Sequence, residues 1–291
     1  MGELTIGVIG GSGLYDLPGL EGVERITVET PYGSPSDALV TGRLHGKRMV
    51  FLPRHGVGHR ILPTEINYRA NIWALKTLGV SQLLSISAVG SMKESIVPGH
   101  LVFVDQFIDL TKRRVSTFFG EGAVAHVPMA DPVCHGMRKL LVQVAKSAGI
   151  VHHEKGTYVC IEGPQFSTRA ESMVYRSWGV DVIGMTNMPE AKLAREAEIA
   201  YATIALATDY DCWHHEEATV TVEMVIATLM ANVEKAKSVI RLYVEHATEN
   251  TASIEATTAA RSSLMTPVDR IPAKTRLALD PILGPVRGPT A

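Results

Sequence analysis

Short apolar segments recur along the chain, and most of them end in a turn rich in glycine or polar residues. Runs typical of buried strands lie at residues 4–9, 48–52, 82–88, 101–104, 156–162, 181–185 and 201–207. Helical spacing of apolar positions is found at residues 67–78, 131–148, 169–178, 189–197 and 222–247. Because strands and helices alternate, the pattern predicts an α/β fold with a mixed or largely parallel sheet covered on both faces. We predict a single domain with a central mixed β-sheet flanked by helices.

The composition changes near residue 251, beyond which Thr, Ser, Ala, Arg and Pro dominate. Such a segment buries little apolar surface by itself. We therefore predict one folded domain over residues 1–250. Residues 251–291 are expected to form a C-terminal tail that is partly ordered or contacts a neighbouring subunit.

Charge and cysteine content narrow the class of protein. The 291 residues carry a formal net charge of −2, so no global basic field favours nucleic acid or an anionic membrane as a partner. The three cysteines show no CxxC spacing, which is typical of reduced thiols. No apolar stretch reaches the length of a membrane span, and the first residues lack the basic start of a signal peptide. We expect a cytoplasmic protein.

Two acids follow the apolar run that ends at Ala207, namely Asp209 and Asp211. On an extended segment this spacing places both side chains on one face, at the strand end where α/β sheets bind ligands. A carboxylate beside a protonated carboxyl would match the donor and acceptor that adenine offers at N6 and N7. The other interpretation is a helix N-terminus stabilised by acidic residues.

Small hydroxyls and cations occur at four strand ends: Ser12, Arg54 with His55, Ser87 and Thr186. In a parallel sheet these ends converge, so together they predict a site that holds one phosphate through hydroxyls, backbone amides and one guanidinium. We predict no metal ion, because no HExxH or cysteine spacing supplies ligands. The glycine turn at residues 10–13 matches neither a P-loop nor a dinucleotide fingerprint.

Separated motifs give the chain a resemblance to the trimeric purine nucleoside phosphorylase family between about residues 6 and 247. They lie at residues 9–14, 53–56, 67–75, 105–109, 162–167, 185–190 and 207–213. The resemblance implies a nucleoside phosphorylase-like fold, no cofactor, and inorganic phosphate as co-substrate. It implies a homotrimer with sites at subunit interfaces. The implied reaction is phosphorolysis of 5′-methylthioadenosine to adenine and 5-methylthioribose 1-phosphate, a step of purine and methionine salvage.

The resemblance also assigns site residues. Phosphate would be bound by Ser12, Arg54, His55, Ser87, Ala88 and Thr186. Asp209 and Asp211 would hold the base and carry the catalytic step, with Asp209 protonated toward N7 and its pKa raised by burial and by Asp211. The nucleoside would be contacted by Phe166, Ser167, Met185, His59, Val222 and Val225. His126, and with it the Leu264–Met265 region, would reach the site of a neighbouring subunit.

The choice of base depends on two positions. Family members that act on 6-oxopurines carry Asn at the position of Asp209 and Glu at the position of Ser167. This chain has neither, which favours adenine, and Val222 and Val225 would suit a methylthio group at the 5′ end. The alternative enzyme is a methylthioinosine or general 6-oxopurine nucleoside phosphorylase. A non-catalytic nucleotide-binding or NAD-dependent protein is a third class, for which the spacing of the first glycine turn is wrong.

Overall fold

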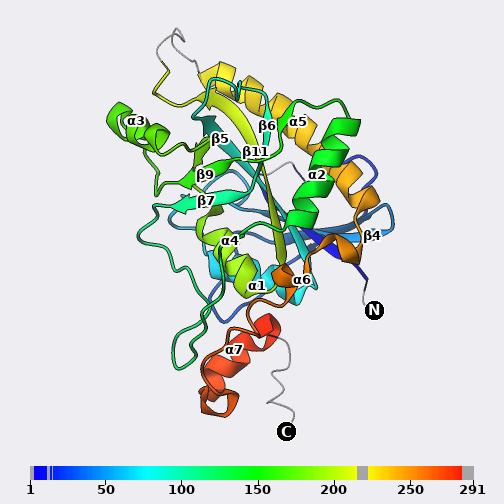
Figure 1. Cartoon of the computed structure of the whole chain (residues 1–291). Coiled ribbons are helices and arrows are strands. Elements are labelled where there is room, and N and C mark those ends of the chain that lie inside the picture. The colour runs from blue at the N-terminus through cyan, green and yellow to red at the C-terminus, as the bar shows by residue number, and fades with distance from the viewer. Residues whose placement is uncertain (1–2, 12–13, 15, 215–221, 284–291) are drawn as a thin grey trace.

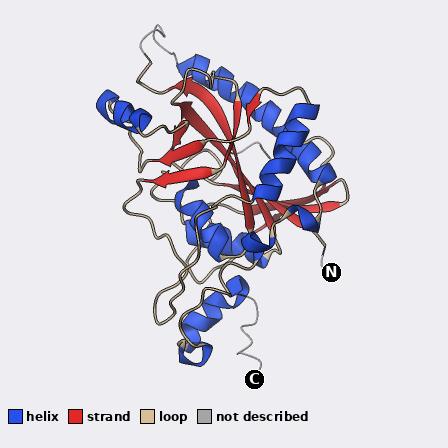
Figure 2. Cartoon of the chain, viewed as in Figure 1, coloured by secondary structure: helices blue, strands red, loops and turns tan. Residues whose placement is uncertain are grey.

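The fold is a mixed sheet with helices on both faces. The computed structural model describes residues 3–11, 14, 16–214 and 222–283; the side chains of residues 222–226 are not described. The strands are β1 (Thr5–Gly10), β2 (Glu21–Ile26), β3 (Leu39–Leu44), β4 (Lys47–Pro53), β5 (Gln82–Ser91), β6 (Leu101–Val104), β7 (Gln106–Asp109), β8 (His152–His153), β9 (Thr157–Cys160), β10 (Val182–Gly184) and β11 (Ala200–Tyr210). The helices are α1 (Tyr68–Thr77), α2 (His135–Ser147), α3 (Arg169–Ser177), α4 (Asn187–Glu196), α5 (Val222–His246), α6 (Ile254–Thr257) and α7 (Ala273–Leu283), with 3₁₀ turns at Glu249–Thr251 and Val268–Arg270. Figure 1 shows these elements, and Figure 2 shows helices on either side of the strands.

Strand β5 organises the sheet. It pairs in parallel with β1 on one side and with β11 on the other, and its last residues also pair with β10. The main path through the sheet runs β2-β3-β4-β1-β5-β10-β9-β7, while β11 continues from β5 to β6 and β8. The carboxyl ends of β1, β4, β5 and β11 therefore lie at one edge, where ligands bind in open α/β sheets.

Alternation along the strands produces two apolar layers, one on each face of the sheet. In β4, Val50 and Leu52 join the layer that also holds residues of α1 and α4, whereas Met49 and Phe51 join the layer under α2 and α5. Successive strand residues point to opposite faces, so a strand buried on both sides is a continuous apolar run. This is why β1 and β11 were recognisable in the sequence, and the predicted fold class is confirmed.

Local signals place the helix ends close to the predicted boundaries. The Asn67 side chain accepts the Ala70 N–H at 3.2 Å to start α1, and Gly79 follows its end at φ +85°. Helix α3 starts with a capping box in which Thr168 and Glu171 bond reciprocally. Both boundaries follow from side chains already visible in the sequence.

The segment after residue 250 is more ordered than its composition predicts. Helix α7 buries Leu279, Ile282 and Leu283 in the same apolar layer as α1, and Trp73 Nε1 donates to the Ala278 carbonyl at 3.0 Å. Residues 251–283 thus pack against their own chain (Figure 1). Within this range α1 supplies the apolar partner that the tail lacks by itself, and contact of the tail with a neighbouring subunit stays a prediction. No described helix is long and apolar enough to cross a membrane.

Candidate active site

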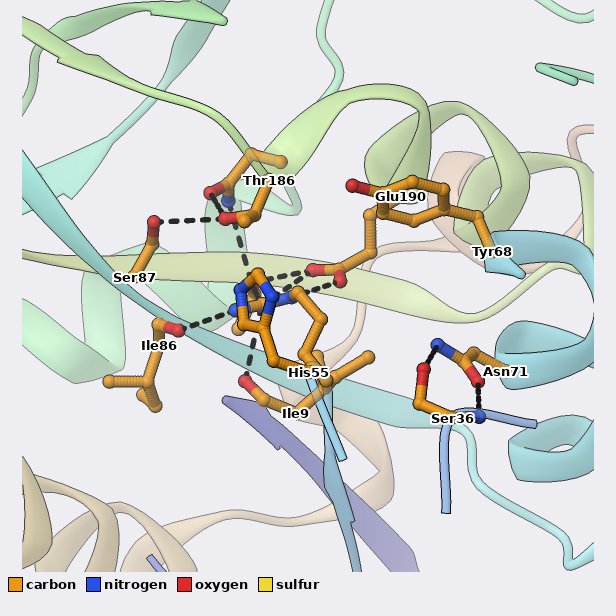
Figure 3. A network of polar contacts seen from close by, with 12 residues as sticks. Ile9, Ser36, His55, Tyr68, Asn71, Ile86, Ser87, Thr186 and Glu190 are labelled. Atoms are coloured by element: carbon orange, nitrogen blue, oxygen red, sulfur yellow. Dashed lines mark hydrogen bonds and ion pairs between the residues drawn. The ribbon is translucent and has the colours of Figure 1, made fainter. Parts of the chain in front are cut away.

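The residues predicted to bind phosphate lie together where β1, β4 and β5 end. Gly10 at the end of β1 lies beside Pro53 of β4, and the Arg54 N–H donates to the Gly10 carbonyl at 2.8 Å. Ser12 lies outside the described residues. The remaining predicted phosphate residues come from the segment after β4, from β5, and from the start of α4 (Figure 3).

Arg54 is buried behind these strand ends, with only 2% of its surface exposed. Its Nε and Nη2 donate to the two carboxylate oxygens of Glu190 at 2.7 and 3.0 Å. Nη2 also reaches Ser85 Oγ at 2.6 Å and the Ile9 carbonyl at 3.3 Å, and Nη1 donates to the Ile86 carbonyl at 2.9 Å. The guanidinium thereby connects β1, β4, β5 and α4. Its direct contact with phosphate stays a prediction.

His55 presents a neutral imidazole. Its Nδ1 lies 2.8 Å from the Ile61 carbonyl, which can only accept, so Nδ1 carries the proton and Nε2 offers a lone pair. Burial lowers the pKa of His55 to about 4, so the ring stays neutral at physiological pH. The exposed His59 stacks on it, with ring centroids 4.2 Å apart. A neutral acceptor of this kind suits the O–H of a monohydrogen phosphate.

Two hydroxyls face each other across the end of β5. Ser87 Oγ and Thr186 Oγ1 are 3.1 Å apart, and both residues are largely buried (Figure 3). Ala88, next to Ser87, is exposed at the same strand end. Thr186 precedes the first residue of α4, where backbone N–H groups point outward. The structure therefore brings Ser87 and Thr186 together as the sequence predicted.

The paired acids lie at the end of β11, against the neighbouring strand β5. The register shifts between Ala207 and Asp209, and Asp209 then pairs with Gly90. A side chain at Gly90 would meet both acids, since its Cβ would lie 3.3 Å from Asp209 Oδ1 and 3.5 Å from Asp211 Cβ. Both acids thus flank one glycine. Helix α5 begins at Val222, so Asp209 and Asp211 do not lie in its first turn, as the other interpretation of these acids would require.

Each acid has a hydroxyl partner. Thr208 Oγ1 donates to Asp209 Oδ2 at 2.7 Å, and Ser172 Oγ of α3 donates to Asp211 Oδ2. Ser167 lies nearby, because the Cys212 thiol donates to its carbonyl at 3.4 Å. The Ser167 hydroxyl oxygen is buried without a hydrogen-bond partner. An unpaired buried hydroxyl in a segment that contacts Cys212, next to Asp211 in the chain, is an available partner for a polar ligand.

The remaining predicted substrate residues are spread around this edge. Phe166 is 86% exposed, and Met185 is half-buried next to Thr186. Val222 begins α5, but the side chains of Val222 and Val225 lie outside the described residues. The pocket for the 5′ substituent, which was predicted from Val222 and Val225, therefore stays a prediction.

His126 is exposed on a loop that pairs with the tail. Its N–H donates to the Ser263 carbonyl at 3.1 Å, and the Met265 N–H donates to the Val124 carbonyl at 2.8 Å. Ala125 and Leu264 form an isolated bridge between the same two segments. The two segments predicted to reach a neighbouring subunit are therefore joined to each other. Their role in a neighbour's site stays a prediction.

A model of the phosphorylase superfamily matches residues 5–245. The chain belongs to the phosphorylase superfamily. Its relatives include S-methyl-5′-thioadenosine phosphorylase of Geobacter sulfurreducens, 58% identical over 283 residues that cover 97% of this chain and 99% of the relative. The protein of the same name from Koribacter versatilis is 53% identical, with coverage of 97% and 96%.

Solved structures give the same result for this superfamily member. A methylthioadenosine phosphorylase from an Antarctic soil metagenomic library superposes with a TM-score of 0.92 at 53% identity, covering 97% of this chain and all of the other. A mutant adenosine/methylthioadenosine phosphorylase of Schistosoma mansoni, solved with adenine, has a TM-score of 0.84 at 40% identity, covering 90% and 99%. The phosphorylase-like fold predicted from the sequence is confirmed.

Sequence reasoning missed a second set of residues in this phosphorylase, those that hold the predicted site in place. Arg114 is an example: its side chain donates to the carbonyls of Glu162, Met185 and Met188 at 2.7, 2.7 and 2.6 Å. It thereby connects the segment that leads to Phe166 with the one that leads to Thr186. In the sequence it is the last of three consecutive basic residues, a pattern typical of an exposed loop.

Glu162 completes this clamp. Burial alone would raise the pKa of its carboxyl, but hydrogen bonds from Lys112 N, Thr64 Oγ1, Arg113 N and Arg114 Nε lower it to about 2. The carboxylate therefore stays ionised at any physiological pH. In the sequence, Glu162 and Glu190 were marked only by their place in recognised motifs. A motif does not say which partner a side chain contacts.

Among the described residues no group of three His, Cys, Asp or Glu side chains could hold a metal ion. Phosphate binding without a metal stays a prediction, and so does the absence of a cofactor.

Proposed function

We propose that this chain cleaves 5′-methylthioadenosine with inorganic phosphate, releasing adenine and 5-methylthioribose 1-phosphate. The observation that carries the proposal is the 58% identity, over nearly the full length of both chains, to a relative named S-methyl-5′-thioadenosine phosphorylase. The arrangement of the site supports the same reaction. We propose that these products enter purine and methionine salvage.

Strand β5 supplies the spacing that such a reaction needs. Ser87, at the hydroxyl cluster, and Gly90, beside the two acids, are three positions apart on this strand. At about 3.3 Å per residue they are separated by roughly 10 Å. A ribose fits between a phosphate bound at one end and a purine held at the other. Phosphate would then lie beside the anomeric carbon and the acids beside the departing base.

The chemistry follows from this placement. Breaking the glycosidic bond makes the sugar cation-like and the purine anionic, so an anion is needed beside the sugar and a proton at the purine. We assign the anion to phosphate held by Ser12, Arg54, His55, Ser87, Ala88 and Thr186, and the proton to Asp209. Asp211, fixed by Ser172, would hold the adenine amino group.

The proposed assembly is a homotrimer whose sites lie at subunit interfaces. Two exposed features support it: Phe166, which is 86% exposed, and the loop of His126, which pairs with the tail. The nucleoside and phosphate are the small-molecule partners, with no cofactor or metal. The cytoplasmic location expected from the sequence stays a prediction.

The test is to incubate the purified chain with 5′-methylthioadenosine, with and without phosphate, and to separate the products by chromatography. Adenine should appear only with phosphate, together with a sugar phosphate. Methylthioinosine is the matched control substrate, and its cleavage to hypoxanthine should be much slower. Preferred release of hypoxanthine would favour a 6-oxopurine enzyme, and release of neither base would contradict the proposal.

A further inference from the structure

Tyr158 of β9 is fully buried. Its hydroxyl contacts Ser87 and Thr186, two residues predicted to bind phosphate. Its oxygen lies 3.3 Å from Ser87 Oγ. It also accepts the backbone N–H of Thr186, with the two atoms 3.4 Å apart. Ser87 and Thr186, which Figure 3 labels, are thus both in contact with a hydroxyl that no sequence motif identified.

The phenol reaches this position only because residue 184 is glycine. Strand β9 pairs with β10 in parallel, with Tyr158 beside Val182, and Gly184 follows at the end of β10. A Cβ on Gly184 would lie 2.0 Å from the Tyr158 hydroxyl oxygen and 2.6 Å from its Cζ, which no packing tolerates. The glycine therefore makes room for the phenol, and the two residues form one structural unit.

The direction of the hydrogen bonds decides what the hydroxyl does. Burial raises the pKa of Tyr158 to about 12, so the phenol keeps its proton. Since the phenol oxygen accepts from Thr186 N, its own proton is available for Ser87 Oγ. A serine oxygen that accepts this proton turns its own O–H elsewhere: Ala88 O lies at 3.3 Å and Thr186 Oγ1 at 3.1 Å.

These contacts are longer than the usual 2.7–2.8 Å of a hydroxyl–oxygen hydrogen bond, so the cluster is not tightly closed on itself. Both the Ser87 and Thr186 protons can turn to an anion without breaking a strong bond. Donation from Tyr158 would then strengthen Ser87 as a donor, because hydrogen bonds in a chain polarise one another.

We propose that Tyr158 is a positioning residue of the phosphate site: through its hydroxyl it directs the Ser87 O–H toward phosphate and holds the backbone of Thr186. The inference rests on the proposed function, since it concerns the site assigned there to phosphate. It adds a group that touches no substrate and acts only through two residues that do.

The test is Tyr158→Phe, which removes one oxygen atom and leaves the ring in place. We expect the phosphate KM to rise about 3- to 10-fold, the scale of one lost hydrogen bond, while the KM for 5′-methylthioadenosine changes less than 2-fold. The matched control is Tyr243→Phe in α5, which removes an equally buried hydroxyl that donates to Gln82 Oε1 at 2.7 Å, at the start of β5 and away from the strand end that carries Ser87. The control should change neither KM.

A second measurement asks whether the effect passes through Ser87. In a Ser87→Ala background, Tyr158→Phe should change the phosphate KM much less than in the wild type, because the acceptor is already missing. Gly184→Ala, which displaces the phenol without removing its hydroxyl, should raise the phosphate KM like Tyr158→Phe. Fully additive effects of the first two substitutions would overturn the proposal, as would a rise in both KM values together.

Phosphate binding can also be measured without turnover, which separates this inference from the proposed reaction. Inorganic phosphate should raise the Tm of the wild type, and the phosphate concentration for half of that shift should be higher in Tyr158→Phe. If the wild type binds phosphate but cleaves no nucleoside, the reaction is wrong and the role of Tyr158 stands. If both proteins respond equally to phosphate, the role of Tyr158 is wrong.

Discussion

Asp209 and Asp211 are held by different parts of the molecule, although one residue separates them. Asp209 accepts from its chain neighbour Thr208, whereas Asp211 accepts from Ser172 on α3. The Asp211 carboxylate is therefore tied to α3, while its backbone N–H donates to the Ser91 carbonyl of β5 at 3.0 Å. This difference suits a base site in which one carboxyl is fixed as an acceptor and the other exchanges a proton.

The choice of base should reside mainly in Asp209. In Asp209→Asn an amide replaces a group that can be a carboxylic acid, so no proton is supplied to the leaving adenine. We expect 5′-methylthioadenosine cleavage to fall by about 10²–10⁴-fold, the scale of general acid catalysis. Methylthioinosine cleavage should fall much less or rise, because an amide can donate to O6. The measurement is the ratio of kcat/KM for the two nucleosides.

Adding Ser167→Glu should extend this change, because a carboxylate there accepts the N1–H that adenine lacks. Ser167→Ala is the control, since it removes the hydroxyl and adds no acceptor. A kcat/KM ratio that stays the same in Asp209→Asn would show that the base is recognised elsewhere.

The Arg54–Glu190 pair predicts a coupled effect on stability and phosphate. Arg54→Ala leaves the Glu190 carboxylate buried without its cation, so we expect a loss of about 3–5 kcal/mol in the free energy of unfolding. Urea melts measure this. The KM for phosphate should rise sharply as well, because the guanidinium holds the strand ends that carry the residues predicted to bind phosphate.

Treatment of the wild type with EDTA is the control for the phosphate site and should leave activity unchanged, since we predict no metal there. Loss of activity with EDTA would contradict the metal-free site. A stable Arg54→Ala protein with an unchanged phosphate KM would remove Arg54 from the site.

At the scale of elements, the loop between β7 and α2 is held by contacts along its length, and its first part is attached through Arg114 and Glu196. Arg114 attaches it to the segments at Met185 and Glu162, and Glu196 at the end of α4 accepts Thr117 Oγ1 at 2.7 Å and Phe118 N at 2.6 Å. The same loop continues to His126. Its anchoring therefore affects both the chain's own predicted site and the loop proposed to reach a neighbour.

Glu196 makes this anchoring dependent on pH. Burial raises the pKa of its carboxyl to about 7, against the lowering effect of its two hydrogen bonds. A raised pKa in the folded state means that its contribution to stability is complete below about pH 4.5 and is lost as the pH rises through about 7. Glu196→Gln should remove this dependence, so the difference in unfolding free energy between wild type and variant should change by up to about 3 kcal/mol between pH 5 and pH 8.

Denaturant melts of both proteins at several pH values test this prediction. Subtracting the variant from the wild type cancels the contributions of His55, His100 and His153, whose pKa values are lowered and whose effects have the opposite sign. A flat difference curve would mean that the Glu196 carboxyl is ionised throughout.

The elements that could be predicted from the sequence are those with a strong local signal. Strands β1 and β11 are continuous apolar runs, and α1 and α3 have capping residues. Strand β2 gives no such signal, because it is an exposed edge strand with polar residues on both faces. Helix α7 was missed because its Thr, Ala and Pro residues predict little order until α1 supplies a partner.

The candidate site divides in the same way. Hydroxyls, acids and the Arg54–His55 pair could be predicted because strand ends meet at one edge of a parallel sheet, a consequence of topology. The residues that hold these side chains in place could not be predicted, since Glu190 and Ser85 are 105 positions apart and Tyr158 and Ser87 are 71 positions apart. Such contacts depend on the packing of whole elements, which no local pattern encodes.

At the scale of the whole molecule, we expect a trimer with shared sites. Mass photometry should give three times the 31.5 kDa chain mass. His126→Ala should raise the nucleoside KM and leave the phosphate KM unchanged, because His126 would approach the neighbour's nucleoside. Replacing the exposed His135 in the same way is the control, since it lies at the start of α2. A fully active monomer at nanomolar concentration would contradict shared sites.

The Arg54–Glu190 pair also constrains how this sequence can change over generations. The two side chains bond each other and, through Ser85, Tyr201 and the carbonyls of Ile9 and Ile86, the three strands β1, β5 and β11. A lineage that replaces either residue alone passes through a protein with a lone buried charge, which costs about 3–5 kcal/mol of stability. Drift at these positions must therefore proceed by simultaneous or compensated steps. The two residues therefore constrain each other's replacement, although 136 positions separate them along the chain.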